Sequence, residues 1–127
     1  MNKDFITYEL AVKLKEKGFN EPCFGYYHTN KGDESFELCG NGDADFLNSM
    51  NFHRIAAPTI SQVLKWLREE KKIYCLPHFE QGIDMWLFYI ERPQAGCEYA
   101  ECISESIYDT YEQAALAGIE HCLDNLI

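Results

Sequence analysis

Two stretches decide the fold: PTISQVLKWLRE at residues 58–69 and DTYEQAA at residues 109–115. In each stretch a threonine is followed three residues later by a glutamine, as Thr59 is by Gln62. A threonine hydroxyl can accept a hydrogen bond from a free backbone N–H in the first helical turn, and the glutamine side chain can reach back to the preceding backbone. Both stretches therefore predict the start of a helix.

Apolar residues at helical spacing extend these two helices over residues 60–71 and 111–126. A further helix is predicted over residues 8–17, where Thr7 can cap the start. Gly18 can end that helix, because glycine readily adopts the left-handed conformation found just after many helices.

Strands are predicted where apolar residues alternate between turn residues. The segments 23–28 and 35–39 are expected to form a hairpin, and further strands are expected over 73–79 and 83–90. A weaker strand is predicted within residues 98–107.

The predicted strands differ in their place within a sheet. Pro77 cannot donate a backbone hydrogen bond, which favours an edge position or a strand end for residues 73–79. The segment 83–90 is apolar on both faces, so we expect a central strand that ends at a turn over 92–96. Residues 40–57 show no periodicity and are predicted to form a long loop.

The predicted order is helix, two strands, helix, two or three strands, helix. Short turns between consecutive strands favour antiparallel pairing. With 127 residues the chain is long enough for one well-buried core. We therefore expect an α+β fold over residues 1–127 as a single domain, with three helices packed on one face of a mostly antiparallel sheet of four to five strands.

The charge balance restricts the classes of partner. The chain has 21 Asp and Glu residues against 11 Lys and Arg residues, which gives a formal net charge of −10. Because nucleic acids and anionic membranes bind proteins largely through Lys and Arg, we expect neither direct nucleic-acid binding nor membrane binding. We expect an unknown protein partner, and a homodimer is the alternative.

No apolar stretch of signal-peptide length follows the N-terminus, and none approaches the length of a membrane span. We therefore expect a cytoplasmic protein. In a reducing compartment the six cysteines, at positions 23, 39, 75, 97, 102 and 122, are predicted to be free thiols. Three disulfides are the alternative if the protein is exported.

A metal centre and a cofactor are not predicted. Cys75, His78, Cys97 and Cys102 could form a zinc site only if they meet in space, and no tight CxxC pair is present. The acidic segment 41–45 begins like a calcium loop but lacks the later ligands. The glycines near it lack the lysine and helix of a phosphate-binding loop.

The chain is also predicted not to be an enzyme. Its histidines, His28, His53, His78 and His121, occur outside any sequence context typical of a hydrolase. His121 and Cys122 are adjacent, but consecutive residues on a helix point about 100° apart. A catalytic pair therefore does not follow from their adjacency.

The aromatic residues are the main candidates for an interaction surface. Helices can cover only one face of the predicted sheet, so aromatic side chains on the other face need a loop, a ligand or a second subunit. The loop over 40–57 and a twofold partner stay open as the cover. The candidate interaction residues are Trp86, Phe88, Tyr26, Tyr27, Phe46 and Phe52.

Three parts of the chain carry a resemblance to a known family. They are residues 56–59 with Val63 and 66–69, the opening 6–11 with 18–19, and 108–114. They resemble a family of small uncharacterised proteins from gut bacteria and their prophages or other mobile elements. The resemblance implies an accessory protein of a mobile element, and it transfers no catalytic residue.

The sequence therefore favours a non-enzymatic accessory or protein-interaction domain. One alternative is an acidic inhibitor that imitates nucleic acid through its charge of −10. Another is a binder of a small molecule or metal on the sheet face and the 40–57 loop.

Overall fold

The computed structural model describes the backbone of residues 3–40, 42–50, 52–94 and 97–127. The chain divides into two compact units, Met1–Thr59 and Ile60–Ile127.

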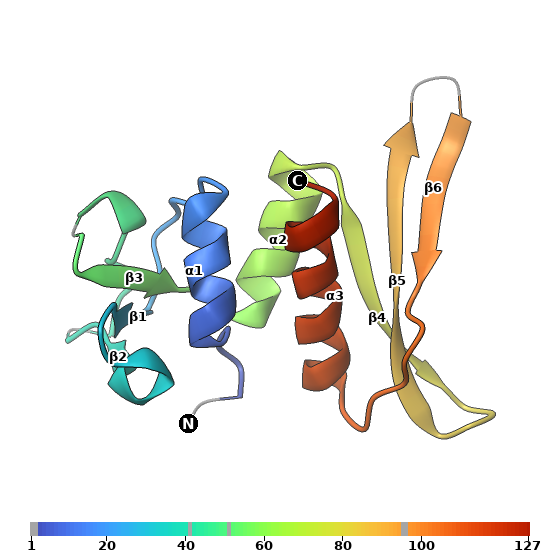
Figure 1. Ribbon diagram of the computed structural model, residues 1–127, viewed down its shortest axis with the longest axis horizontal. Helices are drawn as coiled ribbons and strands as arrows, with labels where there is room; N and C mark the ends of the chain where they lie inside the picture. Colours follow the sequence, from blue (N-terminus) through green and yellow to red (C-terminus); the bar gives the residue numbers. More distant parts are fainter. Residues whose placement is uncertain (1–2, 41, 51, 95–96) are drawn as a thin grey trace. The chain divides into compact units, whose positions relative to one another are not determined.

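The first unit holds one α-helix and a small antiparallel sheet (Figure 1). Its elements are α1 (Tyr8–Glu16), β1 (Gly25–His28), β2 (Glu37–Leu38) and β3 (Arg54–Ala57). The sheet has the order β2-β1-β3, and α1 contacts β3. Short 3₁₀ turns lie at Gly32–Ser35 and Asn48–Met50.

Both ends of α1 follow the sequence prediction. The Thr7 side chain accepts a hydrogen bond from the Leu10 N–H at 3.4 Å. At the other end Gly18 has a φ of +90°, and the Phe19 N–H donates to the Leu14 carbonyl at 3.0 Å. The left-handed glycine thus lets the chain turn back and satisfy a free helix carbonyl.

The predicted hairpin is confirmed, because β1 and β2 pair antiparallel. The predicted 40–57 loop is wrong at its end, where β3 pairs antiparallel with all of β1 from Gly25 to His28. Ile55, Ala56 and Ala57 are all buried, so β3 has no alternation of apolar and polar residues. A four-residue strand without alternation carries no periodic signal.

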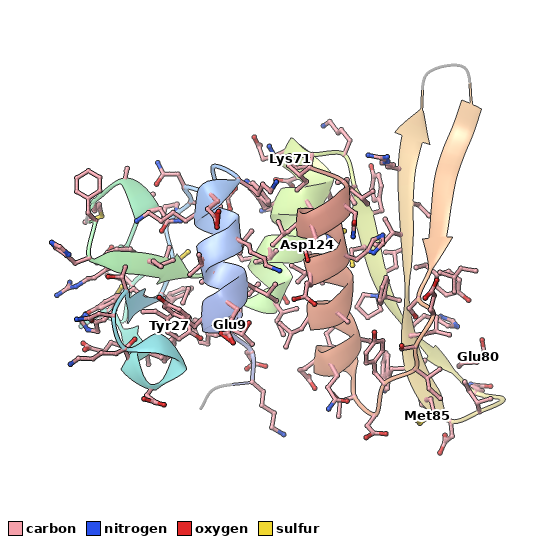
Figure 2. All side chains as sticks on the ribbon, in the orientation of Figure 1. Glu9, Tyr27, Lys71, Glu80, Met85 and Asp124 are labelled. Carbon is pink, nitrogen blue, oxygen red and sulfur yellow. The ribbon has the colours of Figure 1, made fainter. Side chains whose placement is uncertain are left out.

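A buried asparagine connects the remaining loop to the core of the first unit. The Asn48 side-chain amide donates to the Phe19 carbonyl at 2.8 Å, and its carbonyl oxygen accepts from the Ala56 N–H at 2.8 Å. Tyr27, labelled in Figure 2, is 1% exposed and donates its hydroxyl to the Ile6 carbonyl at 2.6 Å. The buried polar groups of Asn48 and Tyr27 therefore have partners, as a stable core requires.

The second unit contains two helices and a second antiparallel sheet with the order β4-β5-β6. In this unit α3 contacts β4 and β5, and α2 contacts β4 and α3 (Figure 1). The elements are α2 (Ile60–Glu70), β4 (Tyr74–Glu80), β5 (Met85–Gln94), β6 (Cys97–Ile103) and α3 (Tyr111–Asn125).

The predicted places of these strands are confirmed: β5 is central, and the proline-containing β4 is at an edge. The turn predicted over 92–96 is wrong at its start, because β5 continues to Gln94 and pairs with β6. The ladder shifts register between Arg92 and Gln94. Pro93 thus falls at the irregularity, where a missing donor does not break the ladder.

The α+β class is confirmed, but the expected single sheet is not. The described strands form two small antiparallel sheets, each within its own unit. The physical reason is β3, which completes a local sheet with β1, while β4, β5 and β6 pair through consecutive hairpins. That residues 1–127 form one domain stays a prediction.

Candidate functional site

The first unit contains a cluster of aromatic and ionisable side chains on β1, β2 and β3. Tyr26 and His28 lie two residues apart on β1, and Glu37 is the cross-strand partner of Tyr26. The Tyr26 hydroxyl donates to Glu37 Oε2 at 3.1 Å, and His28 Nε2 lies 2.7 Å from Glu37 Oε1. Both carboxylate oxygens of Glu37 are therefore engaged.

These contacts shift two pKa values in the cluster. The hydrogen bonds from His28 and then Tyr26 lower the pKa of Glu37, because they stabilise its charged form. Desolvation, followed by the hydrogen bond to Glu37, raises the pKa of Tyr26. Glu37 is thus held as a carboxylate and Tyr26 as a neutral hydrogen-bond donor.

Arg54 and Phe46 complete the surroundings of Tyr26. The Arg54 guanidinium carbon lies 4.7 Å from the centre of the Tyr26 ring, a cation–π distance. The Phe46 ring centre lies 5.1 Å from that of Tyr26. A pocket of about 410 Å³ adjoins this group, and we call it the Tyr26 pocket; its lining residues are Tyr26, Cys39, Gly40, Asp45, Phe46, Met50 and Arg54.

The second unit has an apolar sheet face turned away from α3. The register pairs Leu76 with Tyr89 and Tyr89 with Ile103, so these side chains share one face. Leu76 is 42% exposed and Ile103 is 54% exposed. We call this surface the open sheet face, formed by Tyr74, Leu76, His78, Met85, Leu87, Tyr89 and Ile103.

A hollow of about 420 Å³ lies between α3 and residues 103–108. Ile103 lines this hollow as well as the open sheet face. Carboxylate residues of the lining are Glu105, Glu120 and Asp124, the last of which is labelled in Figure 2. The hollow is therefore acidic, and it shares Ile103 with the apolar open sheet face.

The candidate interaction residues of the second unit lie on the covered face of β5. Phe88 is 5% exposed, and the Trp86 ring centre lies 5.5 Å from that of Tyr111 at the start of α3. The neighbouring Ile90, on the same face, is 2% exposed. The face with Trp86 and Phe88 is therefore the one that α3 covers.

The candidates of the first unit have different surroundings. Tyr26 and Phe46 meet at the Tyr26 pocket, whereas Tyr27 is buried in the core. Phe52 is 92% exposed. Of this set, only Tyr26 and Phe46 are brought together with polar side chains.

The four residues considered for zinc do not share a described site. Cys75 is buried on the face of β4 toward α3, whereas His78 is exposed on the open sheet face. The side chains of Cys97 and Cys102 lie outside the described residues. Among the side chains that the structure describes, no three His, Cys, Asp or Glu residues are placed to hold a metal ion.

The described cysteines, Cys23, Cys39, Cys75 and Cys122, are free thiols. A hydrogen bond with Cys122, together with burial, raises the pKa of Cys75 far above the usual range. Because the thiolate is the reactive form, this buried pair is expected to be unreactive. Cys39 is half-buried and is the more accessible of the four.

Sequence reasoning missed several residues of these surfaces. Arg54 lies 28 positions after Tyr26 in the sequence, and the two side chains meet only because β3 pairs with β1. The open sheet face had a signal, since Leu87 and Tyr89 alternate with the residues that face α3. No local pattern says which of the two faces a helix will cover.

Comparison with protein-family models, with curated proteins and with solved structures finds no match to the chain. A search of the described residues also finds no helix whose length and hydropathy would suit a membrane span.

Proposed function

We propose that the chain is a non-enzymatic protein-interaction domain that binds its partner through the open sheet face. The observation that carries the proposal is the exposure of large apolar side chains there: 36% for Tyr74, 42% for Leu76 and 54% for Ile103. Neighbouring apolar groups exposed on one surface are typical of contact sites.

Charge indicates the kind of partner. Glu80 and Glu91 lie at the two ends of the same face, and His78 is within 3.9 Å of Glu80. Figure 2 places Glu80 and Met85 near the turn that joins β4 and β5. With a net charge of −10, the chain favours a partner that has an apolar centre surrounded by Lys and Arg.

A second copy of the chain is less favoured by the same argument. Two open sheet faces in contact would bring together the glutamates at their ends and two chains of charge −10. Like charges across an interface raise its free energy. The experiment must therefore distinguish a homodimer from a complex with another protein. The role in a mobile element stays a prediction.

The experiment places a photo-crosslinking amino acid at position 76 or 87, in separate variants. The matched control carries it at Lys65, which is exposed on α2 in the same unit. We expect one defined heterologous adduct from positions 76 and 87, and none from position 65. An adduct of twice the chain mass would instead indicate a homodimer, and no adduct at either position would contradict the proposal.

The captured protein is then purified and its binding measured by calorimetry. Leu76→Glu should weaken binding at least tenfold, which corresponds to about 1.4 kcal/mol. Lys65→Glu adds negative charge away from the face and should leave binding nearly unchanged. Circular dichroism of each variant separates lost binding from lost folding.

A further inference from the structure

The Tyr26 pocket belongs to the first unit and is independent of the open sheet face. Aromatic rings and a thioether form its apolar walls, contributed by Tyr26, Phe46 and Met50. Its volume of about 410 Å³ is within the range of ~300 to 1,000 Å³ common for small-molecule sites. Met50 is 61% exposed, so this wall is open to solvent.

Arg54 supplies a positioned positive charge. Its guanidinium lies over the Tyr26 ring, and within the described part of the chain it has no hydrogen bond or ion pair. Glu37, the acidic residue of the cluster, already accepts from Tyr26 and contacts His28 with its two oxygens. The N–H groups of Arg54 are thus available to a carboxylate, which a guanidinium can bind through two parallel hydrogen bonds.

Asp45 lines the same pocket and supplies a negative charge. A ligand that is only an anion would be repelled by Asp45 and by the overall charge of −10. A ligand that is only a cation would be repelled by Arg54. One cation, one anion and apolar walls are together complementary to a zwitterion with an apolar body.

We propose that the Tyr26 pocket binds a free amino acid with an apolar side chain. The ligand carboxylate binds the Arg54 guanidinium, and its ammonium group faces the Asp45 carboxylate. The side chain packs against Tyr26 and Phe46. The proposal adds a small-molecule site to the chain and does not depend on the protein partner.

Three probes of similar size separate the contributions of charge. Phenylalanine has both charged groups, 3-phenylpropionate has only the carboxylate, and phenethylamine has only the ammonium group. Cys39 lines the pocket and is half-buried, so an occupied pocket should slow its alkylation. Peptide mass spectrometry measures the alkylation of Cys39, with the buried Cys23 as an internal control for unfolding.

Phenylalanine should slow alkylation of Cys39 severalfold, and each of the other two probes should have a smaller effect at the same concentration. The inference is overturned if 3-phenylpropionate or phenethylamine protects Cys39 as well as phenylalanine does. It is equally overturned if none of the three protects.

Variants test the assigned residues. Arg54→Gln should weaken protection by phenylalanine at least tenfold, whereas Arg68→Gln, exposed on α2, should not change it. Asp45→Asn should make 3-phenylpropionate as effective as phenylalanine. Because Arg54 packs on Tyr26, Arg54→Lys serves as a second variant that keeps the positive charge, and it should bind phenylalanine with intermediate strength. Undiminished protection by phenylalanine in Arg54→Gln would refute the assignment.

Discussion

At Gly118 the α3 helix lies close against the sheet of the second unit. A methyl group at this position would lie 2.6 Å from Cys75 Sγ and 3.1 Å from Phe88 Cγ. The glycine on α3 therefore lets the helix pack against β4 and β5, although glycine is a weak helix former.

Gly118→Ala should lower the free energy of unfolding by about 1 kcal/mol. Alanine improves helix propensity by ~1 kcal/mol, but overpacking costs ~1 to 3 kcal/mol and outweighs that gain. Urea denaturation measures the difference. Gly82→Ala is the matched control, since a methyl group there meets nothing within 4 Å.

A double-mutant cycle identifies the cause. Cys75→Ala removes the sulfur atom nearest to the added methyl group, so the cost of Gly118→Ala should fall in that background. An equal cost in both backgrounds would mean that the contact with Cys75 is not responsible.

Glu37 provides a pH-dependent prediction at the same scale. Its pKa is lowered in the folded protein, so its stabilising contribution is present above the unfolded pKa and is lost as the pH falls through the folded pKa. Carbon NMR of the Glu37 carboxyl should show a higher midpoint in His28→Ala than in the wild type. Tyr26→Phe should raise the midpoint less, because His28 is the larger cause; a reversed order would contradict this assignment.

Among the elements, the helices follow local sequence signals most closely. The structural α3 begins at Tyr111 after Thr110, whose hydroxyl accepts from the Gln113 N–H at 3.1 Å. Gln113 in turn accepts from the Asp109 N–H at 3.0 Å, one residue before the position that the capping pattern predicts. The cap is thus present, but the Gln113 side chain accepts from the Asp109 N–H and not from the Thr110 N–H.

The helix cap of α3 should contribute less to the free energy of unfolding than its buried side chains do. Thr110→Ala should cost roughly 1 kcal/mol of unfolding free energy, because it removes one acceptor at the helix start. Leu123→Ala should cost about 2 to 5 kcal/mol, because Leu123 is fully buried and its loss leaves a cavity. Chemical denaturation gives both values, and Thr110→Ser, which keeps the acceptor, should stay close to the wild type.

Strand β5 shows how an element can be predicted while its orientation is not. Its position in the centre of the sheet follows from the apolar segment 83–90, which overlaps the first part of β5. Both faces carry apolar residues, and α3 packs on the face of Trp86 and Phe88. Which face stays open therefore depends on where α3 returns to the sheet.

At the scale of the whole molecule, the cysteines offer a direct test. All six are predicted to be reduced, so the unfolded protein should give six reactive thiols without added reductant. In the native protein Cys39 should react faster than Cys23, Cys75 and Cys122, which are buried. Thiol titration before and after unfolding measures both, together with metal analysis.

Fewer than six thiols after unfolding would indicate disulfides and would contradict the expected reducing compartment. Bound zinc in stoichiometric amount would contradict the prediction that the thiols are free of metal. Peptide mapping of alkylated protein also assigns the reactivity of Cys97 and Cys102.

The sequence by itself determined the α+β class, the three helices with their starts, the first hairpin and the central place of β5. These features depend on interactions between residues close in the chain, such as the cap at Thr7 and the left-handed turn at Gly18. Such interactions leave a spacing that can be recognised without knowing the fold.

Only the tertiary structure decided that the strands form two sheets, that β3 exists, and that Arg54 lies over Tyr26. It also decided which face of β5 is open. These features arise from pairing between distant segments, where a short buried strand such as Arg54–Ala57 is stabilised by its partner. Its own residues carry no periodic pattern, because Ile55, Ala56 and Ala57 are all buried. The free energy that stabilises the strand comes from contacts with distant segments, which form only when the chain folds.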